Sequence, residues 1–247
     1  MAALWTIVAA AAAINVYAGV LILLRGWLYP VAIYRPMLLN LALSWMPIVL
    51  VVLFWLGLSL LVLPAVTAVP MAGPVVIWLF LVLSLIAWTA FFPNASYLIT
   101  ELNFSHRRDE DPVPLWFDII QTLTLSVAGI ANALLSLFSV QVISVLLVDP
   151  NSADITGAPV GWILSLSVIF LGTLGVYIGR FVRLNSWDVL KPNRLLGVLF
   201  AHFRQPGQLR TATGYVISYS LLLLILYVPL VFLISADLTA LTSAQNS

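Results

Sequence analysis

Apolar residues fill six long runs of this chain, and polar residues gather in the stretches between them. About 20 apolar residues in a helix are needed to cross roughly 30 Å of hydrocarbon. The runs of this length lie near residues 3–24, 37–63, 74–93, 116–148, 160–182 and 213–235. The pattern predicts an all-α, polytopic transmembrane bundle of about six helices, formed as a single domain over residues 1–235.

Prolines predict where two of these helices change direction. The second run is longer than a bilayer requires, and Pro47 is a natural place for it to bend. The third run begins at Pro74 and meets Pro93, which lacks an amide donor and favours a break, after which Asn94 could cap the next segment. The sequence allows either a bent, interfacial segment that ends near Glu101 or an ordinary helix end with a turn.

The basic residues predict the orientation. All ten Lys and Arg residues fall within 25–35, 107–108 and 180–210, and these stretches alternate with connections that carry none. Because basic loops are retained in the cytoplasm, the sequence predicts three cytoplasmic connections and both termini outside. Arg25 follows the first run and no basic residue precedes it, so we expect a spanning helix there and no cleavable signal peptide. Residues 236–247 are predicted to be a disordered extracytoplasmic tail.

Composition narrows the class of protein. Hydrophobic residues make up 63% of the chain, charged residues 8%, and the mean hydropathy is +1.12, as in an integral membrane protein. Cysteine is absent and the net charge is only +1, which argues against thiolate chemistry and nucleic-acid binding. The two histidines, His106 and His202, are far apart and lack neighbouring ligands. We therefore predict neither a metal site nor a cofactor.

The fifth run carries glycines at helical spacing, Gly172, Gly175 and Gly179, which predict a face where a neighbouring helix approaches closely. Arg180 directly follows this face. Arg180 and Arg183 could extend to lipid phosphates, with Trp187 in the interfacial aromatic belt. Alternatively, Arg180 faces inward and pairs with a carboxylate, for which Glu101, Asp118 and Asp188 lie at the same predicted depth.

Polar residues near the predicted cytoplasmic face form a candidate network, either structural or functional. Its members are Asn94, Glu101, Asp118, Arg180, Arg183, Asn185 and Asp188. Asp118 opens the fourth helix, where a carboxylate is favoured by the positive helix end. Four amides lie deeper in the predicted helices, and hydrogen bonds between helices account for them: Asn15, Gln121, Asn132 and Gln141.

The connection after Asp188 contains an amphipathic stretch, KPNRLLGVLFAHFRQPGQLR, at residues 191–210. Pro192 could open a helix there, and Pro206 with Gly207 could close it. The stretch predicts an in-plane cytoplasmic helix that lies on the membrane surface, with Arg194 and Arg204 at lipid headgroups together with Trp187. Membrane lipids are the expected partners, and an unidentified membrane protein is a further candidate.

Three segments carry a resemblance to a known family: FFPNASYLITEL at 91–102, VPLWFDI at 113–119 and GVYIGRFVRLNSWDVL at 175–190. In these segments, over residues 78–227, the chain resembles the bacterial integral membrane proteins grouped as domain of unknown function 1361. Ser96 stands where the family commonly has Pro, and Glu101 stands where it commonly has Asp. The resemblance implies a multi-pass protein of the bacterial cytoplasmic membrane whose signature segments meet at one face, and it implies no activity.

Three kinds of function stay open at this point. The first is a non-catalytic protein of assembly, regulation or lipid interaction. The second is a membrane-embedded enzyme that acts on an anionic lipid-borne or isoprenoid substrate at the cytoplasmic face. Arg180 and Arg183 would bind the anionic head group, and Glu101, Asp118 or Asp188 would act as acid or base. The third is a transporter of a neutral solute. Coupled transport is disfavoured, because no ionisable residue lies near the middle of any predicted span.

Overall fold

The computed structural model describes residues 2–68, 73–103, 107, 112–149, 155–182 and 192–245. Across these residues the chain is helical and contains no strand. The elements are α1 (Ala2–Leu28), α2 (Arg35–Ser44), α3 (Met46–Gly57), the π-helical η1 (Leu58–Val62), α4 (Leu63–Ala68), α5 (Gly73–Ser96), the 3₁₀-helical η3 (Tyr97–Asn103), α6 (Leu115–Val148), α7 (Pro159–Tyr177), the π-helical η4 (Ile178–Val182), α8 (Pro192–Phe203) and α9 (Gln208–Gln245). Six segments of the described chain are long and apolar enough to span a membrane, which confirms the predicted fold class.

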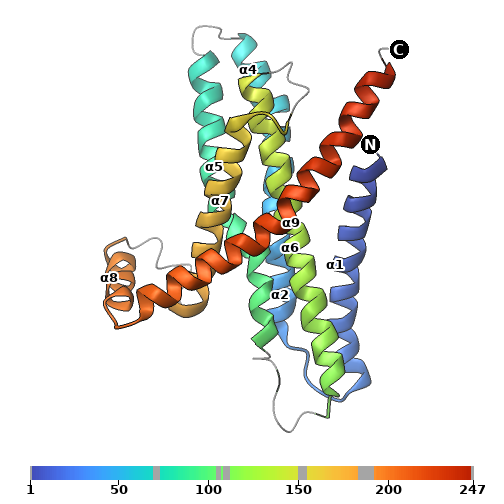
Figure 1. Cartoon of the computed structure of the whole chain (residues 1–247), viewed down its shortest axis with the longest axis vertical. Helices are drawn as coiled ribbons and strands as arrows, with labels where there is room; N and C mark the ends of the chain where they lie inside the picture. Colours follow the sequence, from blue (N-terminus) through green and yellow to red (C-terminus); the bar gives the residue numbers. More distant parts are fainter. Residues whose placement is uncertain are drawn as a thin grey trace.

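The long helices form one bundle around α6, which packs against α1, α3, α5, α7 and η3. Both chain ends lie at the same end of the bundle (Figure 1). We call the other end, where α1 finishes and α6 starts, the basic end, because Arg25 and Arg107 lie there. The main core contains aromatic and aliphatic side chains of α5, α6, α7 and α9, including Trp88, Phe92 and Tyr227.

The second span is interrupted where the sequence predicts a bend. Helix α2 ends at Ser44, Trp45 forms a turn, and α3 starts at Met46 with Pro47 in its first turn. A proline is tolerated there because the first-turn amides have no acceptor within the helix. Pro47 thus lies one residue past the start of α3, beside the interruption of this span at Trp45.

The third span differs from the expectation of a break at Pro93. Helix α5 continues through Pro93 to Ser96, and only then does the chain tighten into η3. Asn94 therefore lies inside a helix and does not cap one. Pro93 costs the helix one hydrogen bond, but its ring packs in the space above Gly175 of α7. At the change of helix type, the Tyr219 hydroxyl of α9 donates to the Ser96 carbonyl at 2.7 Å.

Glycines allow α5 to approach its neighbours closely, as predicted for the fifth span. A Cβ atom on Gly172 would lie 2.5 Å from the Phe92 ring, and one on Gly175 would lie 2.6 Å from Pro93. Gly179 is less constrained, because its Cβ would meet Tyr97 at 3.6 Å, an ordinary contact. The packing interpretation is thus confirmed for Gly172 and Gly175.

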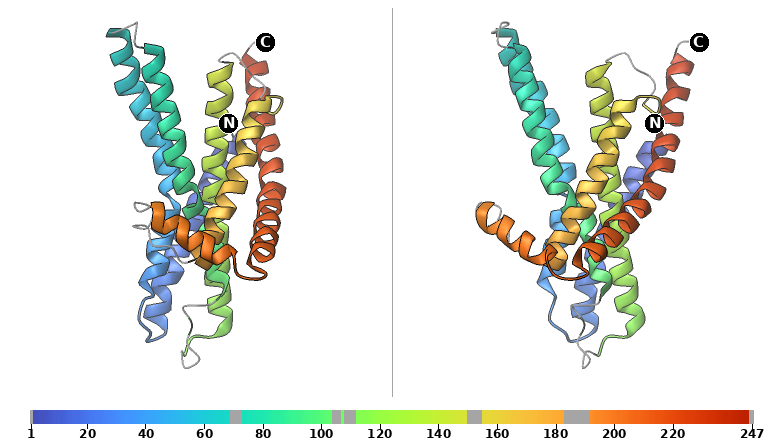
Figure 2. Two further views of the ribbon diagram at one scale, coloured as in Figure 1. Left: turned by 90° about the vertical axis from the view of Figure 1, so that its left-hand side faces the viewer. Right: turned by 60° about the vertical axis from the view of Figure 1, so that its left-hand side comes forward.

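Two segments lie outside the simple bundle. Helix α8 runs across the direction of the long helices, as the left view of Figure 2 shows. It ends at Phe203, and Gly207, with a φ of 84°, turns the chain into α9. Helix α9 then continues to Gln245, where the sequence predicts a disordered tail from residue 236. Asp237 explains part of this extension, because its carboxylate accepts a hydrogen bond from the Ala3 amide at the start of α1 at 3.2 Å.

Candidate functional site

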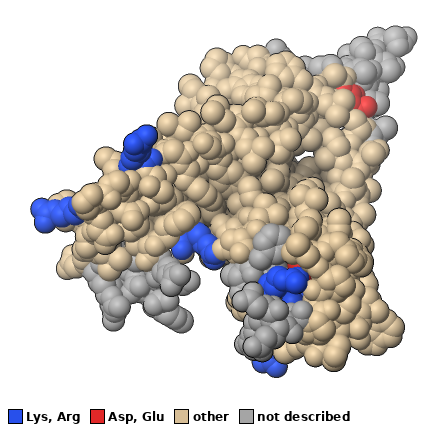
Figure 3. Space-filling model, turned by 60° about the horizontal axis from the view of Figure 1, so that its bottom comes forward, with Lys and Arg blue, Asp and Glu red and all other residues tan. Residues whose placement is uncertain are grey.

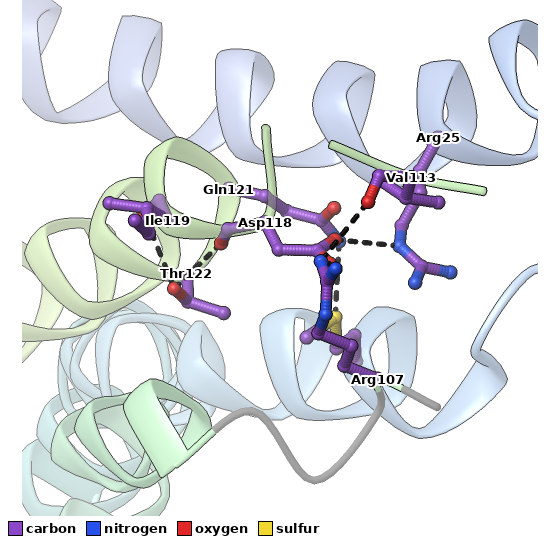
Figure 4. A network of polar contacts seen from close by, with 8 residues as sticks. Arg25, Arg107, Val113, Asp118, Ile119, Gln121 and Thr122 are labelled. Carbon is purple, nitrogen blue, oxygen red and sulfur yellow. Dashed lines mark hydrogen bonds and ion pairs between the residues drawn. The ribbon is translucent and has the colours of Figure 1, made fainter. Parts of the chain in front are cut away.

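The basic end contains a buried carboxylate held by two arginines (Figure 4). Asp118 is fully buried in the first turn of α6. Arg25 Nε donates to Asp118 Oδ1 at 2.9 Å, and Arg107 Nη1 donates to Oδ2 at 2.6 Å. Arg107 Nη1 also donates to the Val113 carbonyl at 3.1 Å. Both carboxylate oxygens are therefore engaged by guanidinium groups.

Helix ends favour this charge arrangement. Pro114 precedes α6 in an extended conformation, so Asp118 falls in the first helical turn, near the positive end of the helix dipole. Arg25 lies in the last turn of α1, near the negative end of that helix. The ion pair thus joins the end of one span to the start of another, and Arg107 fixes the chain leading into α6 to the same point.

A second carboxylate lies nearby in the fold, on η3. Glu101 is 5% exposed, and Asn40 of α2 donates to its Oε1 at 2.7 Å. Its Oε2 has no hydrogen-bond partner among the described residues. On α6, Gln121 donates from Nε2 to the Met37 sulfur at 3.2 Å, and its Oε1 is likewise without a partner in the described chain. Two buried oxygen acceptors therefore remain open between α2, η3 and α6.

Amides join helices deeper in the bundle. Asn15 of α1 and Asn132 of α6 form a reciprocal pair, with N···O distances of 2.9 and 3.0 Å. Asn132 also donates to the Ser44 hydroxyl at 2.9 Å. Farther along α6, Gln141 Oε1 accepts from Ser165 of α7 and Tyr227 of α9. These contacts confirm the predicted interhelical role of Asn15, Asn132 and Gln141.

Aromatic side chains join α7 and η4 to α8 and α9. The Tyr177 hydroxyl lies 3.0 Å from His202 Nε2, and the Tyr177 ring stacks on Phe181 and Phe203. Tyr215 of α9 packs against the same ring, and its buried hydroxyl has no partner within the described residues. His202 is therefore part of the contact that fixes α8 to the bundle.

The structure places the predicted network differently from the expectation. Arg25 and Arg107, and not Arg180, hold the Asp118 carboxylate. Arg180 is only half-buried and lies within electrostatic range of Tyr215. Glu101 bonds to Asn40, and Asn94 is half-buried within α5.

The remaining predicted site residues lie mostly outside the described part of the chain. This applies to Arg183, Asn185, Trp187 and Asp188, and to the side chain of Arg194. Arg204 is described: it is exposed, and its guanidinium carbon lies 4.2 Å from the centre of the Phe200 ring. The proposed headgroup contacts of Trp187 and Arg194 thus stay predictions.

The sequence interpretation missed the roles of Arg25, Arg107 and Asn40. The two arginines were interpreted as topology signals, yet one signal for their pairing was present. Arg25 ends the first span and Asp118 begins the fourth, so opposite charges meet opposite helix ends at one predicted membrane face. The space-filling view from below shows described Arg side chains at the surface of this region, with little acidic surface (Figure 3).

Comparison with known proteins identifies the family and no individual relative. No curated protein and no solved structure matches the chain significantly. The family model described as "Protein of unknown function (DUF1361)" matches residues 39–227. This match includes the second span, which the resemblance over 78–227 left out. Because the match covers most of the 247 residues, this multi-pass membrane protein belongs to the DUF1361 family of proteins of unknown function.

Proposed function

We propose that this protein is a non-catalytic component of the bacterial cytoplasmic membrane that acts through lipid interaction, with its basic end in the cytoplasm. The observation that carries the proposal is the state of Asp118. It is fully buried, and both of its oxygens are engaged by arginines. A buried carboxylate whose two oxygens both accept hydrogen bonds from guanidinium groups is fixed in position and shielded from solvent, so it suits a structural clamp better than an acid or a base.

Helix α8 supports the lipid-interaction part of the proposal. Leu196 and Phe200 are 63% and 61% exposed, and Leu209 beyond the helix is 65% exposed. Arg204 and Arg210 are exposed at the same end of the segment. An apolar face flanked by cations is the pattern of a helix that lies on an anionic membrane surface, where each basic residue contributes about 1 kcal/mol.

The test is headgroup preference of the full chain in detergent, measured by native mass spectrometry with added phosphatidylglycerol or phosphatidylcholine. We expect the anionic lipid to bind more tightly, and we expect the double variant R204Q/R210Q to lose this preference. The matched variant R204K/R210K keeps the charges and should retain it. Equal binding of both lipids by the unmodified chain would contradict the proposal.

One observation favours a second candidate function, a membrane-embedded enzyme for an anionic lipid-borne substrate. Glu101 is buried, and its Oε2 has no hydrogen-bond partner among the described residues. An oxygen of this kind could accept a hydrogen bond or a proton from a bound substrate. Incubation of the chain in nanodiscs with a polyprenyl phosphate tests this candidate. Product formed by the unmodified chain and lost in E101Q would support the enzyme over the non-catalytic protein, and absence of product would remove it.

A further inference from the structure

An apolar crevice lies in the half of the bundle away from the basic end. The α3–α5 arm diverges there from α6 and α7 (Figure 2). The crevice has a volume of about 260 Å³ and lies between these elements, lined by Phe54, Leu85, Trp88, Val140, Ser144 and Leu164 among others. Its lining is almost entirely apolar. Two exposed tryptophans, Trp55 and Trp78, lie along it.

A more polar hollow continues from the crevice at the end of α6. It is lined by Val148, Asp149 and Val160, and by Gly157 of the connection between α6 and α7. Val148 and Val160 line both spaces, so the hollow lies directly beside one end of the crevice. An apolar crevice with a more polar hollow beside it at the end of a membrane helix suits an amphiphile.

We propose that the crevice binds one hydrocarbon chain of a membrane lipid and that the hollow receives its headgroup, which carries no net charge. The size fits a single chain, because pockets for whole drug-sized ligands hold about 300 to 1,000 Å³. The charge follows from Asp149 in the lining of the hollow and from the position of Arg25 and Arg107 at the basic end. An anionic headgroup would meet a negative side chain, and the described residues that line the hollow include no cation.

The apolar surroundings of the crevice favour a hydrocarbon chain as its occupant. The crevice lies between helices that are apolar enough to span a bilayer, so the medium around it is hydrocarbon. An empty apolar space would forfeit dispersion contacts along its walls, and a lipid chain restores them without removing any polar group from water. This site goes beyond the α8 surface proposed above, since it has the opposite charge preference and lies at the other end of the spans.

The test uses the full chain in nanodiscs with phosphatidylcholine that carries a photoactivatable diazirine near the end of one acyl chain. After irradiation, peptide mass spectrometry locates the label. We expect Leu85, Val140 and Leu164 to be labelled at least five times more than lipid-facing Leu221 and Ile225 of α9, whose side chains are exposed without lining the crevice. Equal labelling of crevice and lipid-facing residues would overturn the proposal.

A matched pair of serine variants sharpens this experiment. Ser144 lines the crevice, whereas Ser167 is exposed on α7 and does not line it. We expect S144F to reduce labelling of Leu85 and Leu164 about fivefold, and S167F to leave it unchanged. Unchanged labelling in a folded S144F variant would overturn the site, and the labelling pattern of the unmodified chain decides the matter if S144F does not fold.

A second labelling experiment tests the assignment of an uncharged headgroup. A phosphatidylglycerol probe with the same diazirine chain should label the crevice several times less than the phosphatidylcholine probe. Equal labelling by the two probes would overturn the assignment of an uncharged headgroup. R204Q/R210Q should leave crevice labelling unchanged, so failure of the α8 proposal and failure of the crevice proposal give different results.

Discussion

The two ends of the bundle differ in the kind of side chain that lies between the helices. At the basic end, Arg25 of α1 and Arg107 of the loop before α6 both bind the Asp118 carboxylate of α6. Asn40 of α2 donates a hydrogen bond to Glu101 on η3. At the other end, α5 diverges from α6 and α7 and leaves an apolar crevice. The difference teaches that ion pairs and amide bonds close the space between helices at the basic end, whereas the space between α5, α6 and α7 at the other end is lined almost entirely by apolar side chains.

The largest expected effect comes from removing the charge of Asp118. D118N leaves Arg25 buried without its counter-ion, and a broken buried ion pair typically costs about 3 to 5 kcal/mol of stability. Thermal unfolding of the full chain in detergent, followed by size-exclusion chromatography, measures the loss. E101Q is the matched change at the second carboxylate and should cost less, since only one oxygen of Glu101 is bonded.

The next largest loss of stability is expected where Gly175 of α7 lies close to Pro93 of α5. G175A places a methyl group 2.6 Å from the Pro93 ring, so the helices must move apart, at a cost of about 1 to 3 kcal/mol. G214A is the control in α9, because nothing lies within 4 Å of its added Cβ atom. That change should raise the melting temperature slightly, through better helix propensity. Equal loss in both variants would contradict the packing of Pro93 on Gly175.

The hydrogen bonds between Asn15 and Asn132 should contribute less to stability than the Asp118 ion pairs or the packing at Gly175. N132L removes the reciprocal bonds to Asn15 and the bond to Ser44, and each interhelical bond within a membrane is worth about 0.6 kcal/mol. We expect a loss near 1 to 2 kcal/mol in the same unfolding assay. S139A removes only a bond from Ser139 to its own helix and should be close to neutral. A loss of stability in S139A as large as that in N132L would contradict a stabilising role for the interhelical bonds of Asn132.

The smallest expected effect comes from Arg180, in η4 after α7. It is half-buried and forms no ion pair with Asp118 or Glu101, the two described carboxylates proposed for it. R180Q should therefore cost less than about 1 kcal/mol, as partly exposed charges do, whereas R25Q should cost several times more. Equal melting temperatures for the two variants would show that the network is centred elsewhere.

The sequence predicted the features that depend on one helix or on the bilayer. Run lengths gave the six spans, Pro47 marked the interruption of the second, and Gly172 and Gly175 indicated a close neighbour. The amides Asn15 and Asn132 were placed between helices, and the structure pairs them. Each of these signals follows from local composition, because apolar length and small or polar side chains act wherever the helix is placed.

Features that depend on which helices are adjacent were not predictable in the same way. Arg25, Arg107 and Arg180 all share one predicted face, and hydropathy does not say which of them lies beside Asp118. The packing of α1 against α6 decides it in favour of Arg25. Likewise, helix α5 passes Pro93 because Gly175 of another helix leaves room for its ring. The crevice arises only from the divergence of helices and has no signature in the chain.

The central claim is that the charges at the basic end are a structural clamp, and a double-mutant cycle on Arg25 and Asp118 tests it most directly. Thermal unfolding of R25M, D118L and R25M/D118L is compared with that of the unmodified chain. The clamp predicts that each single variant is strongly destabilised, that the double variant recovers most of the loss, and that the coupling is at least about 2 kcal/mol. Additive losses, with a coupling below about 0.5 kcal/mol, would contradict it.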